Sequence, residues 1–501
     1  MNIIDPYDWV ATLAAADPAR PAIHMPDGQS LSYADLDRQA AHMAATLASL
    51  GVKPGDRVLV QAEKSVAFIV LYLAALRMGA IFVPLNTSYA DGEVAYFIAD
   101  ADPALIITAP ARAAAMTALA AGRAPVETMG QNNDGTLFEK AVTTPPPPRP
   151  APDPKRVAAF LYTSGTTGRP KGAMLTCENF TSNAAVLASE WRFTASDMLL
   201  HALPLFHAHG LFVGVNTTLA AGASMLLLPK FDPAMVLEHL PRAAVFMGVP
   251  TFYTRLLAEP GLTRETAAHM RLFVSGSAPL LAETHQAFEA KTGHAILERY
   301  GMTETLMNAS NPYDGTRVPG TVGPPLPGIE IIITDPETGA PLPQGDIGML
   351  EVRGPNVFTG YWRNPEKTAA DLRDNGFFIT GDLARLDAHG YVHIVGRGKD
   401  LIISGGYNIY PREIEAELDQ LEGVDESAVI GVPDADFGEA VVAVLVAKPG
   451  HSLNPDTLAE ALKPRLARFK HPKFYQILPE LPRNAMGKVM KAELRKTWTR
   501  P

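Results

Sequence analysis

The chain has 501 residues, of which 47% are apolar and 19% are charged, and it contains a single cysteine. This composition indicates a globular protein of more than one domain and excludes a collagen-like chain, a disulfide framework and a wholly disordered protein. The net charge of −10 argues against nucleic acid or an anionic membrane as a partner, and a lone Cys177 excludes a cysteine-based zinc site.

The N-terminal half predicts alternating helices and strands. Residues 1–10 lack the basic and apolar stretches of a signal peptide, so we expect a cytoplasmic protein. Ser32 is expected to cap a helix that ends at Gly51. The most apolar segment, 68–85, contains Arg77, Gly79 and Pro84 and predicts a helix followed by a strand rather than a membrane span.

Short apolar runs continue this pattern along the chain. Residues 57–61, 104–108 and 225–228 alternate with helical segments, which favours α/β layers. The proline-rich segment 143–154 predicts a stiff surface connector.

A domain boundary is expected near residues 396–399. Beyond it the sequence predicts a strand, a helix that runs from Pro411 to Gly423, two strands, a helix and a strand, the content of a small α+β domain. We therefore predict an α/β fold with a large multi-layer N-terminal domain, 1–398, and a small mobile α+β C-terminal domain, 399–501.

The positive charge is concentrated in the second domain. Residues 463–501 contain eleven Lys or Arg and two acids, a net charge of +9, whereas the preceding residues carry −19. Such a segment binds a polyanion or is a solvated basic face. Apolar residues such as Leu466, Phe469 and Phe474 interrupt it, which favours a folded domain over an extended nucleic-acid arm.

A loop rich in glycine and hydroxyl residues follows the predicted strand 157–161. Glycines let backbone amides turn toward an anion, and Lys171 adds a fixed charge, so the loop is typical of a phosphate cradle; an ordinary flexible loop is the alternative. Pro170 excludes the Walker pattern. The phosphate-binding candidates are Thr163, Ser164, Gly165, Thr166, Thr167, Gly168 and Lys171.

This loop resembles the signature of the adenylate-forming superfamily of acyl-CoA synthetases, luciferases and peptide-synthetase adenylation domains. Seven further segments resemble the family's motifs and occur in the family's order. They are 204–207 (PLFH), 276–279 (GSAP), 300–304 (YGMTE), 380–382 (TGD), 396–400 (GRGKD), 404–406 (SGG) and 482–488 (PRNAMGK).

The resemblance implies an ATP site, a Mg²⁺ ligand and a coenzyme A path. An aromatic ring suits adenine, a carboxylate suits ribose hydroxyls, and a hard oxygen ligand suits Mg²⁺. The expected ATP-binding residues are Ser277, Ala278, Pro279, Glu298, Arg299, Tyr300, Gly301, Met302, Thr303, Asp382, Arg397 and Lys488, with Glu304 as the metal ligand. The family's hinge falls at Lys399, and Ser404, Gly405 and Gly406 would contact CoA. Lys470 and Lys473 are further candidates for its phosphates.

Lys488 is the predicted catalytic lysine, together with His207, Thr303 and Glu304. Carboxylate attack on the α-phosphate brings two anions together, and a lysine neutralises the charge that develops. Related synthetases are inhibited by acylation of this lysine, so we expect lysine-acylating and deacylating enzymes as partners.

The acid substrate must be inferred from less standard positions. Arg255, on the helix expected after Pro250, would bind a second carboxylate of the substrate, because an unpaired buried guanidinium is costly. His207 and Ser277 could add donors, and Met307 could limit chain length. Alternatively, Arg255 points outward and pairs with Glu259.

Segments 306–313, 320–323 and 325–328 resemble malonyl-CoA synthetases. We therefore expect ATP-dependent ligation of malonate to CoA through a malonyl-adenylate, releasing AMP and diphosphate. The alternatives are methylmalonate, another short or medium-chain acid, or a stand-alone adenylation module that loads a carrier protein. No carrier domain follows Pro501, which disfavours the last.

Overall fold

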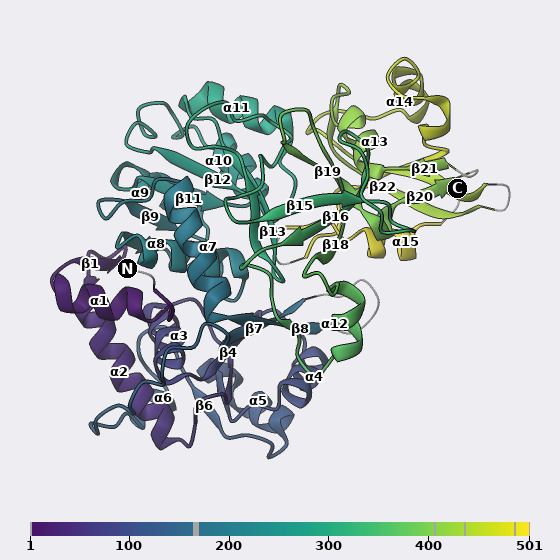
Figure 1. Ribbon diagram of the computed structural model, residues 1–501. Helices are drawn as coiled ribbons and strands as arrows, with labels where there is room; N and C mark the ends of the chain where they lie inside the picture. Colours follow the sequence, from purple (N-terminus) through teal and green to yellow (C-terminus); the bar gives the residue numbers. More distant parts are fainter. Residues whose placement is uncertain (1–2, 164–169, 405–406, 435–436, 485–486, 500–501) are drawn as a thin grey trace.

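The computed structural model describes residues 3–163, 170–404, 407–434, 437–484 and 487–499. Among these residues the strands form four sheets, and three of them belong to a large N-terminal body (Figure 1). The fourth lies in a smaller domain coloured yellow-green, beside the third sheet. The predicted division into a large α/β body and a small C-terminal α+β domain is confirmed.

The first two sheets are mainly parallel, with antiparallel strands at their edges. Across the first sheet the order is β14 (Leu306–Ser310), β13 (Leu297–Met302), β12 (Leu272–Ser275), β11 (Val245–Gly248), β9 (Met198–His201), β10 (Ser224–Leu227), β1 (Pro21–His24) and β2 (Ser30–Ser32). Across the second it is β17 (Gly360–Tyr361), β8 (Lys171–Thr176), β7 (Val157–Thr163), β4 (Ile81–Pro84), β3 (Arg57–Gln61), β5 (Leu105–Thr108) and β6 (Val126–Thr128).

The other two sheets are mainly antiparallel, and a 3₁₀ turn joins them. The third sheet comprises β15 (Glu330–Thr334), β16 (Gly348–Arg353), β18 (Phe378–Leu386) and β19 (Val392–Arg397). The fourth comprises β21 (Tyr407–Ile409), β20 (Ile402–Ser404), β23 (Gly438–Ala447) and β22 (Val424–Asp434), with β24 (Phe474–Ile477) beside β23. The chain passes between them through the turn Gly398–Asp400, where the sequence places the domain boundary.

Helices cover the sheets of the large body (Figure 1). They are α1 (Asp8–Ala16), α2 (Tyr33–Ser49), α3 (Val66–Met78), α4 (Asp91–Ala101), α5 (Ala113–Ala120), α6 (Thr136–Glu139), α7 (Cys177–Glu190), α8 (Asn216–Ala220), α9 (Pro233–His239), α10 (Pro250–Ala258), α11 (Ala282–Thr292) and α12 (Pro365–Asp371). A π-helix, His209–Val215, precedes α8. The small domain adds α13 (Pro411–Leu418), α14 (Pro455–Leu462) and α15 (Lys491–Thr497).

Local sequence signals explain several of these boundaries. Ser32 and Asp35 form the capping box that begins α2, which satisfies two backbone donors at once. Segment 68–85 contributes most of α3 and then β4, and Gly79 ends α3 in the left-handed conformation. Helix α13 ends at Leu418, five residues before the predicted end, and a turn connects it to β22. Of the described helices, none is long and apolar enough to traverse a bilayer.

Candidate active site

Four neighbouring parallel strands of the first sheet end at one edge, where the motif residues gather. Strands β9, β11, β12 and β13 are adjacent and parallel, so the segments that follow His201, Gly248 and Ser275 leave the sheet on the same side, and the end of β13 lies there too. Ligands of open α/β sheets bind at the carboxyl ends of such strands. The fold thereby brings predicted residues from three separate motifs together, those at 204–207, 276–279 and 300–304.

Tyr300 and Asp382 are joined directly. The Tyr300 hydroxyl donates to Asp382 Oδ2 at 2.5 Å, and Arg397 Nε lies 2.7 Å from Asp382 Oδ1. Both Tyr300 and Asp382 are buried, and Asp382 and Arg397 occupy paired positions on β18 and β19. Each carboxylate oxygen retains a lone pair that can accept a hydrogen bond from a hydroxyl group, so this trio places an aromatic ring beside a carboxylate that suits the hydroxyls of a sugar.

Glu298 and Arg299, on the same strand, were both predicted to bind ATP. Glu298 instead accepts a hydrogen bond from Gly320 N at 3.1 Å and lies 3.5 Å from His285 Nδ1. It therefore braces the loop behind the strand. Successive side chains of a strand point to opposite faces of the sheet, so the Arg299 side chain lies in a different environment from that of Glu298.

Glu304 lies beside two hydroxyl groups, one of which belongs to Thr163 of the predicted phosphate-binding set. Its Oε1 is 3.3 Å from Thr163 Oγ1 and 3.2 Å from the Tyr361 hydroxyl. Burial raises the pKa of this carboxyl. Lys171 Nζ lies 5.1 Å from the centre of the Tyr361 ring. The loop residues Ser164, Gly165, Thr166, Thr167 and Gly168 lie outside the described residues, as do Gly405 and Gly406.

Lys488 lies near Asp382 and Arg397 of the trio, although it belongs to the small domain. Desolvation by the surrounding protein and repulsion by Arg397 lower its pKa to about 8, against the opposing effect of Asp382. Part of the side chain remains accessible to solvent. The preceding Gly487 lies against Thr251 of α10, where an added Cβ would be 3.2 Å from the Thr251 hydroxyl. The segment that carries Lys488 therefore lies close both to Asp382 and Arg397 and to the edge of the first sheet.

Arg299 is the most unusual charged residue of this edge. Its side chain is 3% exposed, and its Nε and Nη2 have no hydrogen-bond partner among the described residues. Burial lowers its pKa to about 9, so it remains largely protonated at neutral pH. A Cβ at Gly276 would lie 2.3 Å from its guanidinium, so only glycine leaves room for Arg299 there.

Two histidines and a serine complete a cluster around Arg299. Burial and the Arg299 charge lower the pKa of His207, to about 4, and that of His209, so both rings are neutral. Ser277, held at a positive φ of 71°, places its hydroxyl 3.3 Å from His209 Nδ1. Nε2 of His209 and the hydroxyl of Ser275 are buried without a partner in the described part of the chain. A protonated guanidinium surrounded by unsatisfied polar atoms is a site for an anion.

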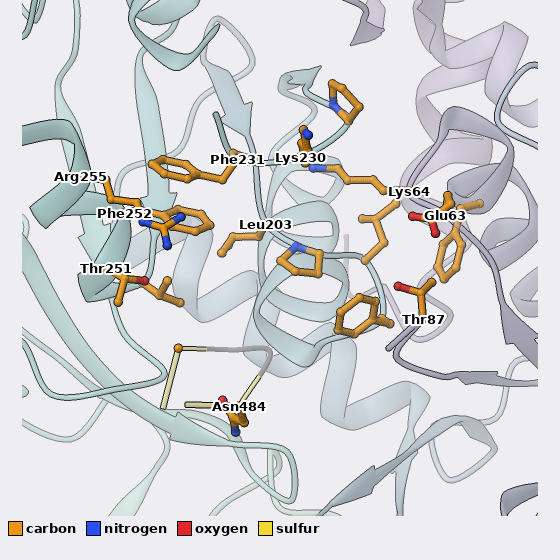
Figure 2. Close-up of a pocket in the computed structure, with 18 of the residues that line it drawn as sticks. Glu63, Lys64, Thr87, Leu203, Lys230, Phe231, Thr251, Phe252, Arg255 and Asn484 are labelled. Carbon is orange, nitrogen blue, oxygen red and sulfur yellow. The ribbon is translucent and has the colours of Figure 1, made fainter. Parts of the chain in front are cut away.

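Arg255 does not join this cluster. Its side chain is exposed and lines a separate cavity of about 420 Å³, so the prediction that it is the buried partner of a substrate carboxylate is not supported. Figure 2 shows Arg255, Phe231 and Phe252 on one side of this pocket, Glu63, Lys64 and Thr87 on the opposite side, and Asn484 of the small domain at its edge. Arg255 and Glu259, both among the described residues, form no salt bridge with each other either.

The predicted candidates for CoA phosphates on the small domain already have acidic partners. Lys470 Nζ lies 2.6 Å from Glu413, and Lys473 Nζ lies 2.7 Å from Asp434. Lys399, the predicted hinge, is exposed in the turn between the third and fourth sheets, and Ser404 ends β20.

Sequence reasoning missed His209 and Ser275 and assigned Arg299 to ATP. The two histidines at positions 207 and 209, close after the end of β9, could have indicated His209. Met307 is buried beside Gly301, and Ala278 and Pro279 follow Ser277 at the same edge.

Comparisons with known proteins agree with this arrangement. The model of the AMP-binding enzyme family matches residues 10–362, and that of the AMP-binding enzyme C-terminal domain matches residues 413–488. A feruloyl-CoA synthase of Amycolatopsis is 37% identical, covering 97% of this chain and 98% of the relative. The mitochondrial malonate–CoA ligase ACSF3 of Mus musculus is 36% identical over 93% of this chain and 86% of its own.

The structure is also similar to that of MatB from Rhodopseudomonas palustris. The two chains are 54% identical, and the alignment covers 99% of each. The TM-score is 0.95 against the ATP-bound form and 0.86 against the apo form. The structure as a whole is therefore more similar to the ATP-bound form than to the apo form.

Proposed function

Since the chain belongs to the AMP-binding enzyme family and is an acid:CoA ligase of the adenylate-forming type, we propose that its acid substrate is malonate. In the first half-reaction a malonate carboxylate attacks the α-phosphate of ATP, forming malonyl-adenylate and releasing diphosphate. In the second, the CoA thiol attacks the acyl carbon and AMP leaves. The malonate–CoA ligases and MatB among its relatives support this substrate, and the feruloyl-CoA synthase makes an aromatic acid the competing candidate.

The single observation that carries the proposal is the buried, unpaired guanidinium of Arg299. An apolar or aromatic acid would leave this charge without a counterion, which is costly. A dicarboxylate supplies one carboxylate to react and a second to pair with Arg299 by charge-assisted hydrogen bonds. Because malonate has one carbon between its carboxylates, the reacting group would lie close to the paired one, beside Ser277 and His207.

The nucleotide is bound by the residues at the other end of this site. Tyr300 offers its ring to adenine, Asp382 accepts from the ribose, and Lys488 lies close enough to Asp382 and Arg397 to interact with them electrostatically. Lys488 would therefore meet the α-phosphate next to the sugar and offset the repulsion between phosphate and carboxylate.

The residues around Glu304 fit a Mg²⁺ ion. Its buried carboxylate lies beside the hydroxyls of Thr163 and Tyr361, and Mg²⁺ takes hard oxygen ligands, often one or two carboxylates completed by phosphate oxygens and water. When bound, Mg²⁺ would neutralise charge on the phosphate oxygens.

The pocket between the domains is the better candidate for CoA phosphates than Lys470 and Lys473. Lys230 and Arg255 line it, and neither forms an ion pair among the described residues, unlike the two lysines of the small domain. The pocket also extends to Asn484 and Gly487, which precede Lys488 in the 482–488 segment. Free cations at an accessible opening suit a polyphosphate.

Diphosphate release with a panel of acids tests the proposed function. Malonate, methylmalonate, acetate, octanoate, benzoate and ferulate are compared with and without CoA. We expect malonate to give the highest kcat/KM, with diphosphate formed without CoA and malonyl-CoA formed with it. A higher kcat/KM for octanoate or ferulate would contradict the proposal, and product formation only on a carrier protein would favour the adenylation module.

A further inference from the structure

A buried lysine and a buried histidine lie behind the acid-binding cluster, and none of the steps above uses them. Lys64 follows β3 and is 9% exposed, and His201 ends β9 and is 2% exposed. They come from different sheets of the large body. Their contact therefore ties the two sheets together at the edge where the ligands bind.

The two residues form a chain of hydrogen bonds that ends on the π-helix. Lys64 Nζ donates to His201 Nδ1 at 2.9 Å and to the His201 carbonyl at 2.8 Å. On the other side of the ring, His201 Nε2 lies 2.8 Å from the carbonyl oxygen of Gly210. Gly210 is the second residue of the π-helix and directly follows His209.

The partners determine the tautomer of His201. A carbonyl oxygen can only accept, so Nε2 carries the proton and Nδ1 accepts from Lys64. Burial and the neighbouring Lys64 lower the pKa of His201 to about 3, so the ring stays neutral and both hydrogen bonds keep their direction.

The π-helix has no room to shift toward these residues. A Cβ on Gly210 would lie 2.0 Å from the Pro204 carbonyl oxygen, and one on Gly214 would lie 3.1 Å from His201 Nε2. π-turns are uncommon and occur frequently at functional sites. The position of His209 thus depends on a backbone segment that is fixed by glycine packing and by one side-chain hydrogen bond.

The buried position of the Lys64 amine has to be explained. Lys64 has no carboxylate partner among the described residues, and removing an amine from water without one is unfavourable for folding. Two apolar side chains could join the same elements at lower cost. What the polar pair provides is a directed contact with the Gly210 carbonyl.

We propose that Lys64 and His201 are positioning residues that hold the start of the π-helix, so that His209 and His207 keep their places beside Arg299 and Ser277 in the acid site. This role rests on the proposed function. Neither residue is among those proposed above to contact the reacting atoms or the nucleotide, although Lys64 also lines the pocket between the domains. Replacing either residue should raise the KM for the acid and leave the KM for ATP nearly unchanged.

The test compares Lys64→Met, His201→Phe and His201→Gln with wild type. Methionine and phenylalanine keep much of the volume and lose the hydrogen bonds, whereas glutamine retains one acceptor and one donor. Lys53→Met, at an exposed lysine of the same domain, is the matched control. For each variant the KM for the acid, the KM for ATP, kcat for diphosphate release and the Tm are measured.

We expect Lys64→Met and His201→Phe to raise the KM for the acid by about tenfold to a hundredfold, the size of effect seen when substrate-positioning groups shift. The KM for ATP should change by less than about twofold, because interactions with the nucleotide are not touched. His201→Gln should recover part of the loss. The double variant should be no worse than His201→Phe alone, because both changes break one chain of hydrogen bonds.

Unchanged KM values for the acid in folded variants would overturn the proposal. So would equal increases in both KM values, additive effects in the double variant, or loss of folding in all three single variants, which would indicate a purely structural pair. The acid used is whichever one wild type prefers. A wild-type enzyme that prefers a different acid would contradict the malonate assignment while leaving this comparison intact.

Discussion

The Tyr300 hydroxyl donates a 2.5 Å hydrogen bond to the carboxylate of Asp382, although 82 residues separate the two in the chain. Tyr300 lies on β13 of the first sheet and Asp382 on β18 of the third. The proposed adenine platform and the proposed ribose acceptor are therefore joined by a contact between two sheets of the large body.

Tyr300→Phe should preserve the ring and remove this hydrogen bond. A hydrogen bond to a charged group contributes roughly 1.5 kcal/mol, so the KM for ATP should rise by about tenfold. The KM for the acid should stay near that of wild type, because Arg299 points to the other side of β13. Initial rates of diphosphate release at varied ATP measure the effect, and an unchanged KM for ATP would show that the contact does not position Asp382.

Lys488→Ala should separate the two half-reactions. Adenylate formation needs a cation at the α-phosphate, so diphosphate release should fall to background. Thioester formation from a supplied malonyl-adenylate should remain substantially intact, because that step breaks the acyl–phosphate bond without attack on phosphorus. Lys491→Ala, three residues along the same segment, is the matched control. An equal decrease in the rates of both half-reactions would show that Lys488 does not act specifically in adenylate formation.

The adenylation rate should also depend on pH through Lys488. The pKa of this lysine in the free enzyme is about 8, and only its protonated form offsets phosphate charge. The value of kcat/KM for ATP, which reports the free enzyme, should therefore fall as the pH rises through about 8. Lys488→Arg keeps its charge across this range, so the inflection near pH 8 should vanish. A wild-type profile that is flat from pH 7 to 9.5 would contradict this prediction.

Two cations of the pocket between the domains should affect CoA alone. Lys230→Met and Arg255→Met should each raise the KM for CoA, since each removes a charge that faces the pocket. Diphosphate release without CoA should not change, because neither residue contacts the acid cluster or Asp382. Thioester formation at varied CoA measures the first effect. An increase in the KM for malonate in Arg255→Met would instead indicate that Arg255 binds the acid.

Much of the fold was predictable because its signals are local. The cap at Ser32, the break at Gly79 and the strand at residues 57–61 each depend on neighbours within a few positions. The order of the motifs likewise predicted the two-domain organisation. The end of α13 was wrong by five residues, because nothing local distinguishes its last turn from the turn that follows.

The acid site was less predictable, because burial is a property of the assembled structure. The sequence alone favoured Arg255 as the buried guanidinium, whereas the structure leaves Arg255 exposed and buries Arg299. Their difference depends on whether β13 directs a side chain inward and whether Gly276 leaves it room. The contact between Lys64 and His201 joins two sheets across 137 residues, and no local pattern marks it.

Arg299 is the residue proposed to select a dicarboxylic acid. The most direct test is diphosphate release without CoA, with malonate and propionate as substrates, in wild type and in Arg299→Met. Wild type should prefer malonate by at least about a hundredfold, since a site built for a polar group rejects an analogue that lacks it. Arg299→Met should lose most of that preference and gain relative activity with propionate, while the KM for ATP is retained. Preference for propionate by wild type, or undiminished preference for malonate in folded Arg299→Met, would contradict the claim.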